Sequence, residues 1–335
     1  MQRIPILDGW RALSILLVLA GHLLPLGPHR WALNGAAAAS GMALFFTLSG
    51  FLITQFLWHR PDVTPFLIRR LFRIVPLAWA AMLALALVTR AASVDLAANL
   101  AFVANLPPTH LLAGGDHLWS LCVEVQFYLG VALLVALGGR RALLLLPLLC
   151  LAVTATRVVQ HAPISIFTWQ RIDEILAGAT LALVHAHAPR WTERLPALLP
   201  LLLLPLVVAA AHEASGALQY ARPYLAAAAV GCSIYAAPAW MRRLFGSAPA
   251  RYVAEVSYAV YVFHVMFAAT WLGSGGTVIR YAKRPLLFAA VFAAAHLSTF
   301  RFERPMIERG KRLERWLVAQ RARSQAVGRP PSSLR

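Results

Sequence analysis

Apolar runs of roughly fifteen to twenty residues follow one another along almost the whole chain. A helix needs about 20 apolar residues to cross the hydrocarbon core of a bilayer, and a helix satisfies all its backbone polar groups within its own segment. With 60% of the residues hydrophobic and 13% charged, the sequence predicts an all-α, polytopic transmembrane bundle of about ten helices. The expected helices lie near residues 6–26, 36–58, 74–88, 118–138, 142–159, 168–184, 195–211, 224–239, 252–271 and 285–299.

Positive charges are distributed unevenly over the predicted loops. With the N-terminus placed inside, 23 of the 31 Lys and Arg residues fall in inner loops and 8 in outer loops. Cytoplasmic loops carry such an excess, so both termini are predicted to be cytoplasmic. The net charge of +18 is explained by this topology, and nucleic acid is not an expected partner. The first apolar run begins almost at Met1 without a small-residue cleavage site, so we expect no cleavable signal peptide.

The first apolar segment carries polar side chains along one side. Arg11 and His22 are eleven residues apart, which at about 100° per residue places them within roughly 20° of one line and about 16 Å apart along the axis. Asp8 lies roughly 40° from the same line. A polar stripe on a spanning helix faces the bundle interior or a wet cavity and indicates function. In the alternative interpretation, Asp8 and Arg11 mark the membrane boundary and His22 bonds a neighbouring helix.

Three arginines precede the third apolar segment, on the predicted cytoplasmic side. Arg70 and Arg73 are three residues apart and Arg69 and Arg73 are four apart, so on a helix they share a face. Such a cluster can bind phosphates through charged hydrogen bonds. It is also what ordinary positive-inside flanking produces.

The fourth segment carries a carboxylate, Glu124, within an apolar run that also offers Trp119, Ser120 and Tyr128. Glu124 is expected in the outer half of the membrane, as is His22. A histidine and a carboxylate at similar depth can form a general base and its orienting partner. They can equally be a structural pair, or lie on opposite sides of the bundle.

Two further segments carry polar pairs at helical spacing. Arg171 and Glu174 are three residues apart, and we expect them to neutralise each other as a structural pair. His264 follows Tyr261 by three residues, and the expected role of this histidine is a core one, satisfied by a neighbour. The three cysteines lie in apolar sequence and are expected to be small buried residues, not a disulfide framework or a metal site.

These motifs together resemble the integral membrane acyltransferase family 3, whose members O-acylate surface polysaccharides, peptidoglycan or antibiotics. The opening Leu7-Asp8-Gly9-Trp10-Arg11-Ala12, followed by His22, looks like the opening of that family. Six further blocks agree in order, and the resemblance extends over roughly residues 1–305; the blocks are 45–53, 69–76, 117–128, 171–174, 257–261 and 303–305.

The resemblance implies a bundle that takes acyl groups from acyl-coenzyme A in the cytoplasm and esterifies a hydroxyl of an acceptor. It places the family's arginine-to-histidine motif on Arg11 and His22, its Arg-x-x-Arg motif on Arg70 and Arg73, and its segment-four glutamate on Glu124. We expect His22 and Glu124 to be catalytic. The residues expected to bind the donor are Arg11, Arg69, Arg70 and Arg73. The chain departs from the family where Cys122 replaces a serine and Val125 a second acid. Glu124 matches the first acid, so activity is expected.

The resemblance also sets the expected partners. The donor is acyl-coenzyme A, with acetyl as the expected group, and no permanently bound cofactor or metal is expected. The acceptor is a glycan or a lipid-linked saccharide, and the location is the inner (plasma) membrane, crossed many times. Residues 1–305 form the predicted acyltransferase domain. Residues 306–335 form a basic cytoplasmic tail that lies on anionic lipid and is disordered over 328–333.

Two other classes of function stay open on the residues alone. A proton-coupled transporter also uses intramembrane His, Glu and Arg, but internal repeats with matching broken helices would favour it, and no convincing repeat is found. A non-catalytic scaffold would not need the arginine cluster.

Overall fold

The computed structural model describes residues 3–187, 192 and 194–327, and the side chains of 321–327 lie outside the description. Within these residues the chain is helical and contains no strand, which confirms the all-α class. The helices are α1 Ile6–Leu23, α2 Leu33–His59, α3 Val63–Thr89, α4 Ser93–Leu100, α5 Trp119–Gly138, α6 Leu146–Val159, α7 Asp173–His187, α8 Leu199–Ala211, α9 Arg222–Ala236, α10 Ala239–Phe245, α11 Ala248–Ala268, α12 Thr277–Ala282, α13 Arg284–Leu297 and α14 Arg304–Val327.

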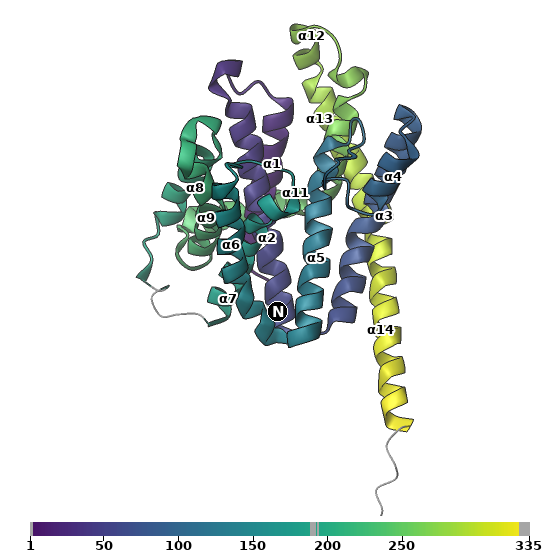
Figure 1. The fold of residues 1–335 in the computed structure, drawn as a ribbon. Helices are drawn as coiled ribbons and strands as arrows, with labels where there is room; N and C mark the ends of the chain where they lie inside the picture. The colour runs from purple at the N-terminus through teal and green to yellow at the C-terminus, as the bar shows by residue number, and fades with distance from the viewer. Residues whose placement is uncertain (1–2, 188–191, 193, 328–335) are drawn as a thin grey trace, which may run out of the picture.

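The central helix of the bundle is α2, which packs against α1 on one side and α7 on the other. Helix α1 also packs against α11, α11 against α13, and α14 along α3. The start of α1 and the described end of α14 lie at the same end of the bundle (Figure 1). We call this end the N-terminal end. The predicted disorder of 328–333 falls outside the described residues.

Each of the ten predicted segments contains a helix, but fewer than ten of those helices are long enough to span a bilayer. Among the described residues six qualify by length and hydropathy, or seven if Glu213–Ala236 and Ala239–Phe245, bent by 109°, count as one broken span. The predicted count of about ten is therefore not confirmed. Length is one physical reason: α7 has 15 residues and α8 has 13, and at 1.5 Å per residue such helices fall short of a hydrocarbon core of about 30 Å. Helix α11 is long enough with 21 residues, but it carries Arg251 and Glu255 and is not among the helices that qualify.

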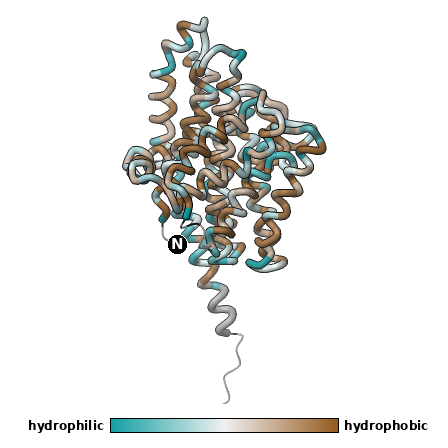
Figure 2. The backbone as a smooth tube through the Cα atoms, turned by 90° about the vertical axis from the view of Figure 1, so that its left-hand side faces the viewer, coloured by the Kyte–Doolittle hydropathy of each residue, from teal (hydrophilic) through white to brown (hydrophobic). Residues whose placement is uncertain are grey.

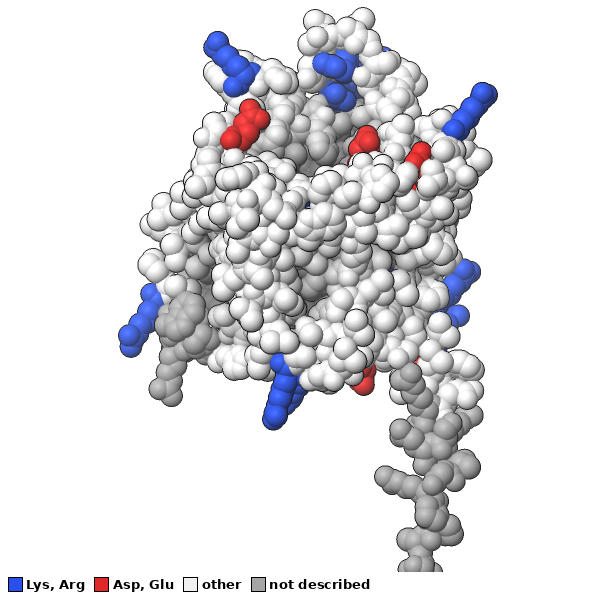
Figure 3. All heavy atoms as spheres, viewed as in Figure 1, with Lys and Arg blue, Asp and Glu red and all other residues white. Residues whose placement is uncertain are grey.

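Hydropathy follows the bundle axis. Figure 2 shows apolar residues through the middle of the helices and hydrophilic residues toward both ends. Charged side chains on the face drawn in Figure 3 gather toward its upper and lower ends, with a wide and almost uncharged band between. The distribution is typical of a protein whose middle lies in hydrocarbon.

The third helix begins earlier than predicted. The sequence placed a basic turn before residue 74, whereas α3 begins at Val63 and carries the arginines within its first three turns. Pro65 is tolerated in this first turn because backbone N–H groups there have no intrahelical acceptor, so the N–H that proline lacks would form no helical hydrogen bond. Phe66 is buried and anchors this turn in the core. Arg69, Arg70 and Arg73 are therefore held at helical spacing, as their predicted shared face requires.

Glycines allow α2 and α7 to approach closely. A Cβ placed on Gly50 would lie 1.8 Å from the backbone oxygen of Ile175, and one on Gly178 would lie 2.0 Å from that of Thr47. Small residues permit such backbone contact between membrane helices. The contact fixes α2, and with it Ser49, against the start of α7.

We expect Gly50→Ala to destabilise the protein, because the added methyl meets backbone atoms that cannot turn aside. Overpacking typically costs about 1–3 kcal/mol, which should lower the midpoint of thermal unfolding in detergent. The matched control is Gly130→Ala on α5, where a Cβ would meet nothing within 4 Å. Ala is favoured over Gly within helices, so this control should unfold no earlier than the wild type. An unfolding midpoint for Gly50→Ala equal to that of the control would contradict the close contact.

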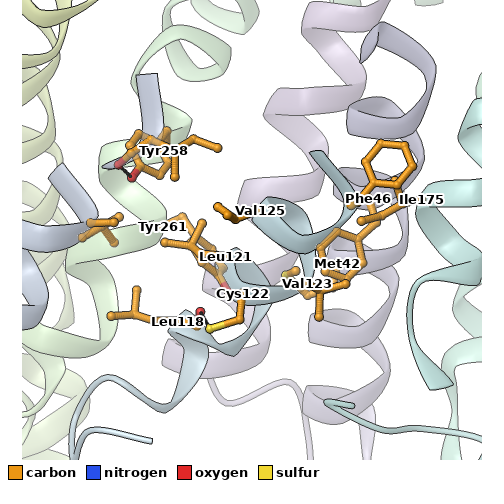
Figure 4. Packing of buried hydrophobic residues seen from close by; sticks show 14 of the residues in the cluster. Met42, Phe46, Leu118, Leu121, Cys122, Val123, Val125, Ile175, Tyr258 and Tyr261 are labelled. Carbon is orange, nitrogen blue, oxygen red and sulfur yellow. Dashed lines mark hydrogen bonds between the residues drawn. The ribbon is translucent and has the colours of Figure 1, made fainter. Parts of the chain in front are cut away.

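Apolar packing of α2, α5, α7 and α11 forms the core around the polar groups. Figure 4 shows Met42 and Phe46 from α2 beside Ile175 from α7, with α5 side chains between them and the tyrosines of α11. Cys122 belongs to this core and is fully buried. It therefore acts as a small apolar residue, as predicted.

Candidate functional site

A cavity of about 780 Å³ opens at the end of the bundle opposite the N-terminal end, and we call it the His22 cavity. Its walls are mostly small and apolar, and the polar side chains that line it include His22, His117, Arg171 and Tyr261. They come from the last turn of α1, the turn before α5, the turn before α7, and α11. The side chain of His22 is exposed at the wall of this cavity.

Hydrogen bonds fix which nitrogen of His22 carries the proton. The Nδ1 atom of His264 lies 2.6 Å from the carbonyl oxygen of Tyr261, which only accepts, so Nδ1 of His264 is the protonated nitrogen. In neutral His264 the Nε2 atom is then an acceptor. It lies 2.8 Å from Nδ1 of His22, which must donate. The Nε2 atom of His22 is left with a free lone pair.

A third histidine completes this wall. His117 is buried and its Nε2–H donates to the carbonyl oxygen of Val262 at 3.1 Å, while its Nδ1 has no partner. Its ring lies 4.9 Å from that of His264, centroid to centroid. The prediction that His264 is a core histidine satisfied by a neighbour is confirmed. Its bond to His22 was missed, because 242 residues separate the two.

A second polar group lies deeper, and we call it the arginine pocket: Arg11, Arg70 and Arg73 around Glu124. These side chains line a small cavity of about 30 Å³. Arg11 donates from Nε to Ser257 at 3.0 Å, and Arg70 lies over the ring of Tyr128 at 5.9 Å. The buried Glu303 also interacts with Arg11 and Arg73, so three cations are set against two carboxylates and an excess of positive charge remains. Such a pocket favours a ligand that carries negative charge.

The structure does not pair Glu124 with His22. Glu124 accepts hydrogen bonds from Ser49 and Tyr128, each at 2.5 Å, and it lines the arginine pocket, whereas His22 lines the His22 cavity. The predicted orienting partner of His22 is therefore replaced by His264. The predicted shared depth was also wrong, because His117 lies at the level of His22 and Glu124 follows it by seven residues, which is about 10 Å along a helix.

Two stacked rings stand between the two compartments. Phe45 lines the arginine pocket and Tyr261 lines the His22 cavity, and their ring centroids are 6.2 Å apart at an interplanar angle of 10°. The Tyr261 hydroxyl is held by Ser120 and by the backbone oxygen of His117. Ser120 thus serves as a support for this wall.

Arginine side chains also connect the pocket with the N-terminal end. Arg73 lines two further cavities there, of about 180 Å³ and 650 Å³. The larger one is shared by Arg11 and Asp8, and Asp8 accepts from Arg3 at 2.7 Å. Arg73 therefore faces both the interior and the approach from that end.

Arg69 differs from its two neighbours. Its side chain is exposed and forms two hydrogen bonds with Glu314 of α14, at 2.5 and 2.7 Å. Arg69 also lines the cavity of about 180 Å³ with Arg70 and Arg73, so its support in donor binding stays a prediction beside this link to the tail helix. Arg70 and Arg73 are half-buried and retain the predicted place.

The expected neutralisation of Arg171 by Glu174 is only partial. Arg171 Nη2 lies 3.3 Å from Glu174, whereas Arg222 Nε lies closer, at 2.8 Å. Trp119 lies under the Arg171 guanidinium, 5.5 Å from it. Within the described part of the chain, no group of three His, Cys, Asp or Glu is placed to hold a metal ion.

The fold and the two compartments define a helical membrane protein with a histidine-lined cavity next to an arginine pocket. A family model described as an acyltransferase domain matches residues 4–300. The chain belongs to the integral membrane acyltransferase family 3, as its motifs predicted.

Curated relatives agree with this family. The chain is 29% identical over 150 residues to the peptidoglycan O-acetyltransferase OatA of Listeria monocytogenes, covering 38% of this chain and 23% of that protein. It is 28% identical over 229 residues to a putative peptidoglycan O-acetyltransferase, YrhL, of Bacillus subtilis, covering 58% and 35%. A putative O-acetyltransferase of Staphylococcus aureus is 31% identical over 156 residues, covering 38% and 24%. The matched parts span about a quarter to a third of these relatives. No solved structure matches the chain.

Proposed function

We propose that this acyltransferase moves an acyl group, acetyl by preference, from acyl-coenzyme A to a hydroxyl of a saccharide acceptor. The observation that carries the proposal is the free lone pair of His22 Nε2 in a large cavity. The stacked rings of Phe45 and Tyr261 separate this cavity from the arginine pocket. The cavity holds the acceptor, a glycan or lipid-linked saccharide. Arg70 and Arg73, which also line the cavity of about 180 Å³ at the N-terminal end, hold the phosphates of the donor.

The chemistry follows from this placement. His22 Nε2 removes the proton of the acceptor hydroxyl while the oxygen attacks the thioester carbonyl. The new C–O bond forms, the C–S bond breaks, and the proton held by His22 passes to the leaving thiolate. The bond from His22 to His264 fixes the ring in the required tautomer throughout. General-base assistance of this kind contributes about 10²–10⁴ in rate.

The same proposal orients the protein. The N-terminal end, with the arginines and both termini, faces the cytoplasm, where coenzyme A thioesters are available, and the His22 cavity faces the outer side of the plasma membrane. The excess of Lys and Arg in the predicted inner loops supports this orientation. The basic side chains of α14 then lie near the cytoplasmic leaflet, which is anionic.

Sided proteoliposomes test the proposal. Labelled acetyl-coenzyme A is supplied to one face only, with a mixture of oligosaccharides in both compartments, and the orientation of the inserted protein is determined by tail proteolysis. We expect labelled ester and free coenzyme A only when the donor reaches the face that carries α14. Proton flux without ester formation would instead identify a transporter.

A further inference from the structure

A buried group of charges behind the His22 cavity is unbalanced. It contains three arginines, Arg157, Arg171 and Arg222, and two carboxylates, Asp173 and Glu174, all at most 2% exposed. Arg157 pairs with Asp173 at 2.5 Å and Arg222 with Glu174 at 2.8 Å. Both carboxylates are thus matched, and one positive charge is left over.

The surplus charge belongs to Arg171. Its one ionic contact is the longer one with Glu174, and its Nε and Nη1 atoms are buried without a hydrogen-bond partner. A buried polar group left without a partner costs about 1–3 kcal/mol, and more when it is charged. Arg171 is also the member of this group that lines the His22 cavity. A ligand in the cavity is therefore placed to supply the missing partner.

We propose that Arg171 binds a negatively charged group, a carboxylate or a phosphate, of the molecule that occupies the His22 cavity. The inference rests on the proposed function, which identifies this molecule as the acyl acceptor. The acceptor is then an acidic saccharide or a saccharide phosphate. A full negative charge is required because a neutral carbonyl or hydroxyl does not offset a buried guanidinium.

Other groups on the walls fit this ligand. His117 has an unpartnered Nδ1, which can accept a hydrogen bond from a sugar hydroxyl. Trp119 offers an aromatic face beneath Arg171. The carboxylates that line the cavity, Asp116 and Glu213, are exposed, where water and salt screen them.

The test compares acceptors that differ in charge alone. The first pair is a disaccharide uronate and the corresponding uronamide; the second is a disaccharide with an anomeric phosphate and its methyl glycoside. We expect wild-type kcat/KM to favour the charged member of at least one pair by roughly tenfold or more. The pair that shows the preference identifies carboxylate or phosphate as the natural group.

In Arg171→Gln the preference should vanish, and because it is a ratio of two kcat/KM values in one preparation, it does not depend on any overall loss of rate. Arg171→Lys should keep part of the preference. Arg90→Gln alters an exposed arginine at the end of α3 that does not line the cavity, and it should keep all of the preference. Equal use of charged and neutral acceptors by the wild type would overturn the proposal, and this comparison needs no variant to fold. So would an undiminished preference in Arg171→Gln.

A binding measurement separates this proposal from the proposed function. Calorimetric titration of the full-length protein with the uronate and with the phosphate disaccharide requires no turnover. Binding that weakens roughly tenfold in Arg171→Gln supports the anion site even if no ester forms. Ester formation on neutral acceptors without any anion preference supports the enzyme and removes the anion site.

Discussion

His22→Gln should lower turnover by about two to four orders of magnitude, the full contribution of a general base. Glutamine has nearly the size of histidine and its amide can still donate to Nε2 of His264, but it cannot take a proton from a hydroxyl. Affinity for acetyl-coenzyme A should stay almost unchanged, because His22 does not line the arginine pocket. Single-turnover transfer and donor binding, measured on the same preparation, check both parts.

Two companion variants sharpen this result. His185→Gln alters a histidine that bonds Tyr235 outside both compartments, and it should transfer at the wild-type rate. His264→Ala should lower turnover less than His22→Gln, because the base remains while its tautomer is no longer fixed. Combined with His22→Gln, the second change should add little, as expected of residues that act together. Near-normal turnover in His22→Gln would make this histidine structural.

Arg70→Ala and Arg73→Ala should each weaken donor binding roughly tenfold or more, since a hydrogen bond to a charged group contributes about 1.5–3 kcal/mol. The reason is their half-buried position around Glu124, where the positive charge exceeds the negative. Binding of a non-hydrolysable acetyl-coenzyme A analogue to the detergent-solubilised protein measures the effect. Turnover at saturating donor should fall less than affinity.

The control for the arginines is Arg141→Ala, an exposed arginine in the turn between α5 and α6. It removes the same charge outside the pocket and should leave affinity unchanged. Arg69→Ala should weaken binding less than Arg70→Ala or Arg73→Ala, because Arg69 is exposed and already paired with Glu314. Unchanged affinity in both Arg70→Ala and Arg73→Ala, in protein that inserts normally, would reduce the cluster to a topology signal.

The sequence predicted what depends on helical periodicity. The stripe of Asp8, Arg11 and His22 lies on one helix, so a rotation of about 100° per residue is sufficient to align them. The face shared by Arg70 and Arg73 follows from the same rule, although their helix begins eleven residues earlier than expected. The all-helical class follows from composition alone.

Contacts between distant segments were beyond this reasoning. The bond from His22 to His264 depends on how α1 and α11 pack, and no spacing within either segment encodes it. Glu124 was assigned to His22 because the two have similar predicted depth. The depth estimate was too coarse, because Glu124 lies at the level of Arg11 and His117 at the level of His22. The sequence also did not predict that Arg222 is the closer partner of Glu174, because this contact depends on how α7 and α9 pack.

The stacked rings of Phe45 and Tyr261 determine what has to move when an acyl group passes from donor to acceptor. Tyr261 is held by two hydrogen bonds, so turning its ring aside would break both. Phe45 has no polar atom and is only half-buried, so its ring can rotate without such a loss. Side-chain rotations are far faster than rearrangements of packed helices. For the proposed transfer we therefore expect Phe45 to be the ring that moves and Tyr261 to stay in place.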